Sequence, residues 1–253
     1  MTWIDLNSDL GENTPDRIVS DDAAMLEIVT SANVSCGFHA GSPLGIRETL
    51  AAAVAAGVTI GAHPGYDDYE NFGRENQDID PATLQAQVEY QLGAHEGLTR
   101  SVGGRVAYVK PHGALYNLSA RDRGVAEAIA VAVRDFDPSL IVYGLAGSES
   151  IAAAAAIGLR VANEVFAERR DQADGRLVPR GQDGAVIEDL DGALAQVRMM
   201  LHDGAVAART GERVPIRADT LCLHGDRADA PAFARALREA LEADGIGVRA
   251  PDA

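Results

Sequence analysis

The sequence is poor in basic residues, and this shortage excludes whole classes of partner. Among 253 residues, 22 Lys and Arg stand against 38 Asp and Glu, which gives a formal net charge of −16. Proteins that bind nucleic acid or anionic membrane surfaces need clustered cations to displace counterions, and this chain contains no basic run. We therefore expect neither a nucleic acid nor a membrane as a partner.

Cysteines and long apolar runs are also scarce. The two cysteines, Cys36 and Cys222, are too few for a disulfide framework, and each lies in an apolar run where a free thiol packs as a small hydrophobic group. No apolar stretch reaches the roughly 18–20 residues that a membrane-spanning helix needs. These features predict a protein of the reducing cytoplasm.

Several familiar catalytic motifs are missing as well. The chain has neither a Gly-x-x-x-x-Gly-Lys-Ser/Thr loop nor a Gly-x-Gly-x-x-Gly turn, so the usual phosphate-binding loops are absent from the sequence. It also lacks a Gly-x-Ser-x-Gly elbow, a Cys-x-x-Cys pair and a His-Glu-x-x-His helix. Any chemistry must therefore come from other groups.

What is present predicts an α/β protein. Short apolar runs alternate with amphipathic stretches of about ten to eighteen residues, which indicates a parallel sheet covered by helices. Helix signals include Ser42 with Pro43 at a start and Gly57 at an end, and Asp80 with Pro81 before a helix from Thr83 to about Leu98. The predicted strands are residues 3–7, 33–37, 58–62, 106–110, 140–145, 159–164 and 220–224.

Polar and glycine-rich segments follow five of these strands. In parallel α/β proteins the carboxyl ends of the strands meet at one face, where side chains from different strands converge on a ligand. Contributions from five strands favour a closed barrel over an open doubly wound sheet. No break in composition marks a linker, so we expect a single domain over residues 1–253.

The histidines point to the candidate site. Four of the six histidines follow an apolar run, with Gly or Pro within two residues: His39, His63, His112 and His224. One such histidine alone could simply be hydrogen-bonded in a turn, but four in equivalent positions favour a functional cluster. His95 and His202 fall inside predicted helices, and we expect both at the surface.

Carboxylates and a lysine lie in the same segments. Asp9, Glu12 and Asp226 could orient a histidine and raise its basicity, or share a divalent metal with it, and the sequence leaves both uses open. Lys110 precedes Pro111, which biases it toward an extended conformation at a strand end. There its ammonium could hold a substrate carboxylate or a developing oxyanion.

Two long loops complete the pattern. Residues 66–77 contain Asn71-Phe-Gly-Arg74, and residues 164–184 contain Phe166-Ala-Glu-Arg169 and Asp174-Gly-Arg-Leu-Val-Pro-Arg180. Loops of this length in a compact domain usually have a function. Their aromatics and arginines favour a lid or a contact with a partner.

Six motifs, in order along the chain, together resemble the LamB/YcsF family. They are Asn7-x-Asp9-x-Gly11-Glu12, Ser35-Cys-Gly-Phe-His39-Ala-Gly41, Gly61-Ala-His63-Pro-Gly-Tyr66, Lys110-Pro-His112-Gly-Ala-Leu-Tyr116, Asp174-Gly-x-Leu-Val-Pro-Arg180 and His224-Gly-Asp226. The resemblance implies a seven-stranded parallel β/α barrel, a distorted TIM-like fold of the polysaccharide deacetylase type. Ser42 and Glu168 depart from the family pattern, which usually has Asp at both places.

The resemblance also implies an activity. The family's reaction is ATP-dependent opening of the lactam ring of 5-oxo-L-proline to L-glutamate, by the A subunit of a 5-oxoprolinase that also has B and C subunits. On this basis we expect ATP as cofactor and those two subunits as partners. The expected catalytic residues are Asp9, Glu12, His39, His63, Lys110, His112 and His224, and the expected substrate-binding residues are Asn7, Tyr66, Arg74, Arg180 and Asp226.

Two other functions stay open at this point. One is a metal-dependent deacetylase or amidohydrolase of the same barrel type, which would use a metal-bound water without ATP. If a metal is present, its expected ligands are Asp9, His39, His63 and His112. The other is a non-catalytic subunit that binds a small acid and presents it to another protein.

Overall fold

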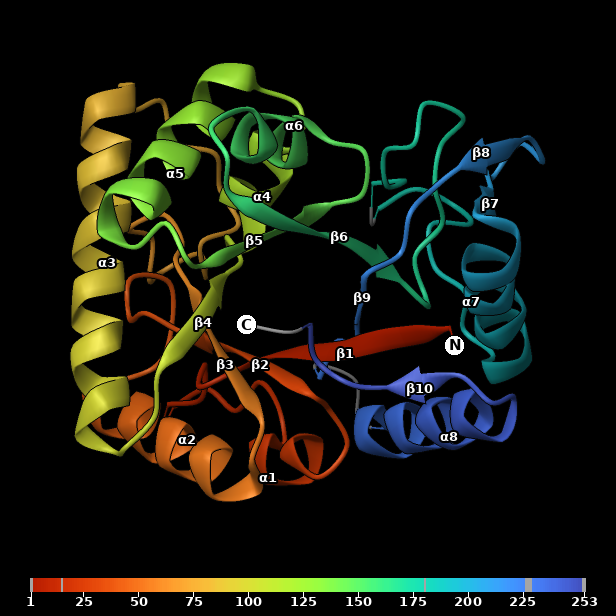
Figure 1. The fold of residues 1–253 in the computed structure, drawn as a ribbon, viewed down its shortest axis with the longest axis horizontal. Helices are drawn as coiled ribbons and strands as arrows, with labels where there is room; N and C mark the ends of the chain where they lie inside the picture. The colour runs from red at the N-terminus through yellow and green to blue at the C-terminus, as the bar shows by residue number, and fades with distance from the viewer. Residues whose placement is uncertain (1, 15, 180, 226–228, 252–253) are drawn as a thin grey trace.

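A closed barrel of parallel strands forms the centre of the molecule (Figure 1). The computed structural model describes residues 2–14, 16–179, 181–225 and 229–251. The strands follow one another around the ring in the order β1, β2, β3, β4, β5, β6 and β9, and β9 pairs with β1 to close it. This confirms the predicted seven-stranded parallel β/α barrel.

The barrel strands lie close to their predicted positions. They are β1 (Trp3–Leu10), β2 (Ser31–Ser35), β3 (Thr59–His63), β4 (Val106–Val109), β5 (Ile141–Leu145), β6 (Arg160–Phe166) and β9 (Thr220–Cys222). Three short strands were not predicted, because two or three residues carry too little alternation to detect. Of these, β10 (Gly247–Val248) pairs with the start of β1, and β7 (Ala205–Ala207) forms an antiparallel pair with β8 (Arg213–Pro215).

Helices surround the barrel in Figure 1. They are α1 (Asp22–Leu26), α2 (Pro43–Ala56), α3 (Pro81–Ser101), α4 (Gly113–Ser119), α5 (Arg123–Phe136), α6 (Glu149–Ala156), α7 (Leu190–Asp203) and α8 (Ala230–Ala243). The predicted helix signals are confirmed: Ser42 caps α2, Gly57 ends it in the left-handed conformation, and Asp80 caps α3. Among the described residues, no helix is both long and apolar enough to cross a membrane.

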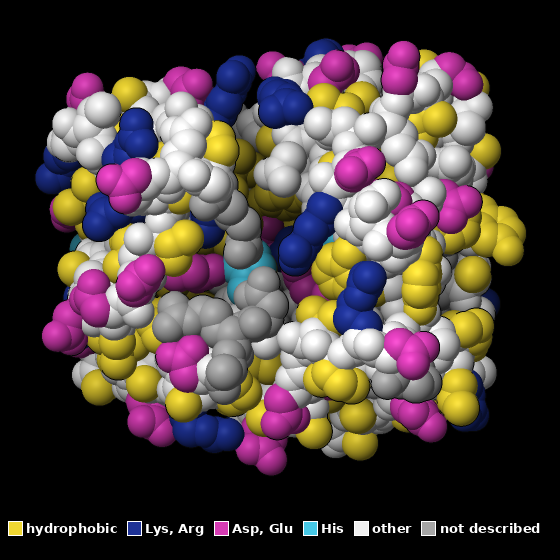
Figure 2. Space-filling view, turned by 180° about the vertical axis from the view of Figure 1, so that it is seen from behind, with side chains coloured by type: hydrophobic (Ala, Val, Ile, Leu, Met, Phe, Trp, Pro, Cys, Tyr) yellow, Lys and Arg dark blue, Asp and Glu magenta, His cyan; other side chains and the backbone are white. Residues whose placement is uncertain are grey.

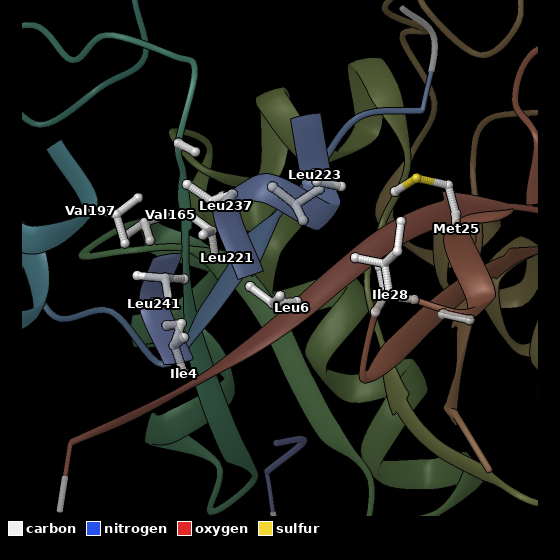
Figure 3. Packing of buried hydrophobic residues seen from close by; sticks show 14 of the residues in the cluster. Ile4, Leu6, Met25, Ile28, Val165, Val197, Leu221, Leu223, Leu237 and Leu241 are labelled. Atoms are coloured by element: carbon white, nitrogen blue, oxygen red, sulfur yellow. The ribbon is translucent and has the colours of Figure 1, made fainter. Parts of the chain in front are cut away.

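The apolar core lies between the barrel and the helices. Figure 3 shows Leu6 and Leu221 of the barrel strands beside Leu237 and Leu241 of α8. Small aliphatic residues dominate elsewhere, and the alanines on the inner faces of α5 and α6 are buried. Small side chains let these helices approach the strands closely.

The inside of the barrel, in contrast, is polar. Along β1 the residues alternate: Ile4 and Leu6 point outward into the apolar core, whereas Asp5, Asn7 and Asp9 point toward other strands across the barrel. The predicted first strand stopped at Asn7, which was wrong, because these polar residues continue the strand to Leu10.

Asp5 lies at the centre of the deepest polar group. Its carboxylate accepts hydrogen bonds from the hydroxyls of Thr30, Ser31, Tyr143 and Thr220, at 2.6 to 3.1 Å. Burial raises the pKa of Asp5, although the four hydroxyl donors favour its charged form. One side chain thus connects β1, β2, β5 and β9 inside the barrel.

Replacing Asp5 with alanine tests whether this polar group stabilises the barrel. In Asp5→Ala, four hydroxyls lose their acceptor, and we expect the free energy of unfolding to fall by about 3 kcal/mol or more, because each unsatisfied buried donor costs roughly 1–3 kcal/mol. Urea unfolding followed by circular dichroism measures the change. The exposed Asp78 provides the control, and equal stabilities of Asp78→Ala and Asp5→Ala would contradict a stabilising role for this polar group.

Candidate active site

A cavity of about 560 Å³ lies where the carboxyl ends of several barrel strands meet. Figure 2 shows a hollow near the centre of one face, with a histidine side chain at its floor and charged side chains around it. The cavity lining brings together five of the predicted catalytic residues: Asp9, His63, Lys110, His112 and His224. Glu12 and His39 lie just behind this wall, in contact with His63 and His112.

Lys110 is the only lysine in the sequence, and it is buried, with 3% of its surface exposed. Its Nζ lies 3.0 Å from Asp9 Oδ1 and 2.8 Å from Glu164 Oε1. The same ammonium donates to Asn7 Oδ1 at 3.1 Å and to Cys222 Sγ at 3.2 Å. Burial alone would lower the pKa of Lys110, but the carboxylates of Asp9 and Glu164 outweigh it and hold that pKa well above its usual value.

This arrangement changes the expected role of Lys110. Its charge is already balanced by two carboxylates, so the ammonium fixes the site from within instead of reaching out to a substrate. Glu164 was not among the predicted site residues. It was expected at the end of a strand and the start of a loop, but it lies inside β6 and points into the barrel.

Cys222 packs in an apolar cluster, as predicted. Its sulfur also accepts a hydrogen bond from Lys110 inside the barrel, and this part in the site was not predicted. Burial raises the pKa of the Cys222 thiol well above its usual value in spite of the nearby ammonium, so the thiol stays neutral. Cys36 packs against an apolar cluster, as predicted.

Three histidines and a glutamate form a second buried group beside the lysine. Glu12 Oε1 lies 3.0 Å from His39 Nε2, 3.3 Å from His112 Nδ1 and 3.9 Å from His63 Nε2. His39 and His112 stack with their ring centroids 3.8 Å apart. Asp9 approaches the group from the cavity side, with Oδ2 at 3.5 Å from His63 Nε2.

Backbone carbonyls fix two of these rings. His63 donates from Nδ1 to the carbonyl of Lys110 at 2.7 Å, and His112 donates from Nε2 to the carbonyl of Phe72 at 2.9 Å. Burial lowers the pKa of His112 to about 3, and the neighbouring His39 and His63 add to this effect. For His63, burial is outweighed by Asp9, and its pKa is raised.

Within the described residues, four side chains could together bind a metal ion, and they are not the four that were predicted as ligands. Glu12, His39, His63 and His112 each offer a ligand atom, and these atoms all lie within 4.8 Å of one another. Asp9, which was expected in the set, contacts Lys110 and Asn33 instead and reaches His63 only at its edge. The reason is that Asp9 still lies inside β1, whereas Glu12 follows the strand and turns back toward the histidines.

The remaining predicted substrate-binding residues lie in different places. Arg74 lines the cavity, as expected. Asn7 lies below the cavity, with its amide bonded to Lys110, Asn33 and Thr220. Tyr66 is 1% exposed within an apolar cluster that includes Leu84 and Leu115, so the predicted contact with substrate does not fit its position. Arg180 and Asp226 lie outside the described residues.

His224 lines the cavity just after β9, the strand that pairs with β1. It pairs through Nδ1 with the carboxylate of Glu168 and stacks on Phe166, with ring centroids 5.5 Å apart. Phe166 ends β6, and Glu168 lies in the long loop that follows, of which Arg169, Gln172 and Arg176 line the cavity. The loop therefore builds one side of the site, and its expected action as a lid stays a prediction.

The two remaining histidines differ from each other. His202 is exposed, as predicted. His95 was expected at the surface, which was wrong, since it is 1% exposed and burial lowers its pKa to about 4. It lies on the buried face of α3 with Leu92 and Thr99, and the three- and four-residue spacing of that face was the signal that could have placed it.

Glycine is required where the first long loop passes the histidines. Gly73 has a φ of +62°, and a Cβ there would lie 2.8 Å from His39 Cβ and 3.0 Å from His112 Cδ2. Phe72 before it also has a positive φ, of 59°, and its carbonyl accepts from His112. The Asn71-Phe-Gly-Arg74 motif thus sets the backbone against the imidazoles.

Replacing Gly73 with alanine tests this close approach, and Gly57 provides a matched control. Both have positive φ values, but a Cβ at Gly57 meets nothing within 4 Å. We expect Gly57→Ala to cost only the left-handed backbone penalty of about 1–2 kcal/mol. Gly73→Ala should in addition displace the rings, which shifts the imidazole signals of His39 and His112 in ¹⁵N NMR spectra. Unchanged imidazole signals in a folded Gly73→Ala protein would contradict the assignment.

Comparisons with known proteins agree with this architecture. The chain is 53% identical over 247 residues to the A subunit of the 5-oxoprolinase of Bordetella pertussis, with 98% of both chains covered. The corresponding 5-oxoprolinase protein of Bordetella parapertussis shares the same identity and coverage. The crystal structure of the lactam utilization protein from Thermus thermophilus superposes with a TM-score of 0.93 at 43% identity, over 99% of this chain and 100% of that one.

A more distant structure shares the fold alone. The catalytic domain of a peptidoglycan N-acetylglucosamine deacetylase from Eubacterium rectale has a TM-score of 0.52 and 9% identity, over 99% of this chain and 89% of that one. The LamB/YcsF family model matches residues 4–253, nearly the whole chain. The resemblance seen in the six motifs is therefore confirmed, and this chain belongs to the LamB/YcsF family.

Proposed function

We propose that this chain is the A subunit of an ATP-dependent 5-oxoprolinase, which opens 5-oxo-L-proline to L-glutamate together with B and C subunits. The observation that carries the proposal is the cavity wall, where Asp9, Lys110 and His224 are held in place by buried partners. It is supported by the 53% identity to proteins that are named as the A subunit of this enzyme.

The reaction needs activation, because a lactam carbonyl is a poor electrophile. ATP can supply it: the lactam oxygen attacks the γ-phosphorus and ADP leaves. Water then adds to the activated carbon, and the ring C–N bond breaks as the nitrogen takes a proton, which leaves an acyl phosphate. A second water hydrolyses this acyl phosphate to glutamate and phosphate. The sum is hydrolysis of one ATP and one lactam to ADP, phosphate and glutamate.

The side chains of this cavity fit the proton transfers. Asp9 is held by Lys110 and reaches the cavity, where its carboxylate can accept a hydrogen bond from the attacking water and orient it. His224, which follows the neighbouring strand β9 and is oriented by Glu168, can donate a proton to the ring nitrogen. A general acid of this kind contributes about 10²–10⁴ in rate.

Cations on the cavity wall fit an anionic substrate in spite of the net charge of −16. Arg74, Arg121 and Arg176 line the cavity and can hold the carboxylate of 5-oxoproline or a transferred phosphate. Charges on the outer helices act weakly at the site, because physiological salt screens them over about 8 Å. Since the sequence has no phosphate-binding loop, we assign much of the ATP binding to the B and C subunits.

Reconstitution tests the proposed function. The chain is mixed with the B and C subunits, and glutamate formed from 5-oxoproline is measured with and without ATP. We expect turnover only with ATP. His224→Gln should lower it by about 10²-fold or more through loss of the proton donor. His202→Gln, which changes an exposed histidine, should leave turnover unchanged.

Three outcomes would contradict the proposal. No glutamate from an assembled complex would exclude 5-oxoprolinase activity. Amide hydrolysis that does not need ATP would favour the amidohydrolase alternative. Full turnover by His224→Gln in a complex that still binds 5-oxoproline would indicate that this chain presents the acid without acting on it.

A further inference from the structure

We propose that Glu12, His39, His63 and His112 form a binding site for one divalent transition-metal ion. All four side chains are buried, and their ligand atoms lie within 4.8 Å of one another. The set combines three imidazoles with one carboxylate. These ligands suit zinc, iron, cobalt or nickel better than calcium or magnesium, which prefer oxygen alone.

The spacing of the ligand atoms fits a small coordination shell. Four ligands at about 2.0–2.1 Å from a central ion lie roughly 3.3–3.4 Å from one another when the arrangement is tetrahedral. Glu12 Oε1 lies 3.0 Å from His39 Nε2 and 3.3 Å from His112 Nδ1. His63 Nε2 lies 3.0 Å from His112 Nδ1 and 3.9 Å from Glu12 Oε1. Some of these distances are shorter and one is longer than the ligand-to-ligand distance expected for a tetrahedral ion.

The tautomers of two histidines give the strongest argument. The backbone carbonyls of Lys110 and Phe72 take the protons of His63 Nδ1 and His112 Nε2. In the neutral rings the other two nitrogens carry lone pairs, and these nitrogens face each other at 3.0 Å. Two lone pairs at this distance repel unless a proton or a metal ion lies between them. Such outer hydrogen bonds to carbonyls are also what orients metal-binding histidines.

The negative charge around these four side chains also favours a bound cation. With neutral imidazoles, the four side chains carry the single negative charge of Glu12. Beside them, the carboxylates of Asp9 and Glu164 outnumber the one ammonium of Lys110. Buried charge is costly unless it is paired, so a divalent cation at this place would offset the excess.

The position connects the ion to the cavity. His63 and His112 line the cavity, so an ion held between the four side chains lies at its wall, close to Asp9. There it would polarise an oxygen of a bound substrate as a Lewis acid. This catalytic role rests on the proposed function, whereas the binding of the ion does not.

Metal binding by the isolated chain tests the proposal. The protein is stripped with a chelator and titrated with Zn²⁺ or Co²⁺ in a calorimeter, and bound metal is counted by mass spectrometry after gel filtration. We expect one ion per chain, and for Co²⁺ a visible absorption spectrum typical of nitrogen and oxygen ligands. Glu12→Gln and His112→Asn should each weaken binding by at least about 100-fold, since loss of an outer partner alone costs 10–100-fold.

His202→Asn is the matched control for adventitious binding by a surface histidine, and it should bind like the wild type. Two variants are used so that a folding defect in one, seen by circular dichroism, leaves the other to decide. Substoichiometric metal in the wild type would overturn the proposal and mean that a proton holds the two facing nitrogens. Equal binding by the wild type and a folded Glu12→Gln or His112→Asn protein would place the metal elsewhere.

The assay contains neither 5-oxoproline, ATP nor partner subunits. A failure to bind metal is therefore distinct from a failure of the complex to form glutamate.

Discussion

The ion group around Lys110 is the interaction on which the rest of the site depends. A single ammonium joins Asp9 of β1, Glu164 of β6 and Cys222 of β9 across the barrel, with distances of 2.8 to 3.2 Å. The carbonyl of the same residue accepts from His63 and so orients the first ring of the histidine group. Breaking a buried pair of this kind typically costs roughly 3–5 kcal/mol, because the partner charges stay buried. Geometry and stability at the site are therefore coupled.

The polar barrel interior explains how a mostly aliphatic chain positions this group. Apolar residues face outward to the helices, and the inward row of β1 passes from Asp5 through Asn7 to Asp9. Tyr108 donates to Asn33, which in turn donates to Asp9, so the carboxylate at the cavity is fixed from below. The ring of Tyr108 packs against β3 at Gly61. Glycine is required there, because a Cβ would lie 2.1 Å from the ring. A filled and hydrogen-bonded interior gives the site rigid support.

Much of the fold, and the presence of the site, could be predicted from the sequence, because apolar strand patterns, helix caps and the turns after strands are local signals. Asp9, His63, Lys110, His112 and His224 were expected together, and they share one cavity. What the sequence did not reveal depends on contacts across the barrel. Nothing in the sequence around Glu164, Cys222 or Asp5 indicates which residues they contact. Glu12 rather than Asp9 joins the histidines because β1 ends between these two acidic residues.

The most direct test of the central ion group uses the fact that Lys110 is the only lysine. Protein labelled with ¹⁵N at the lysine side chain gives one Nζ signal, whose chemical shift reports the charge of the amine. With Asp9 and Glu164 as partners, the signal should stay that of an ammonium through and beyond pH 10.5, the usual lysine pKa, while circular dichroism shows an intact fold. A signal that titrates at or below pH 10.5 in the folded protein would contradict the paired, buried ammonium.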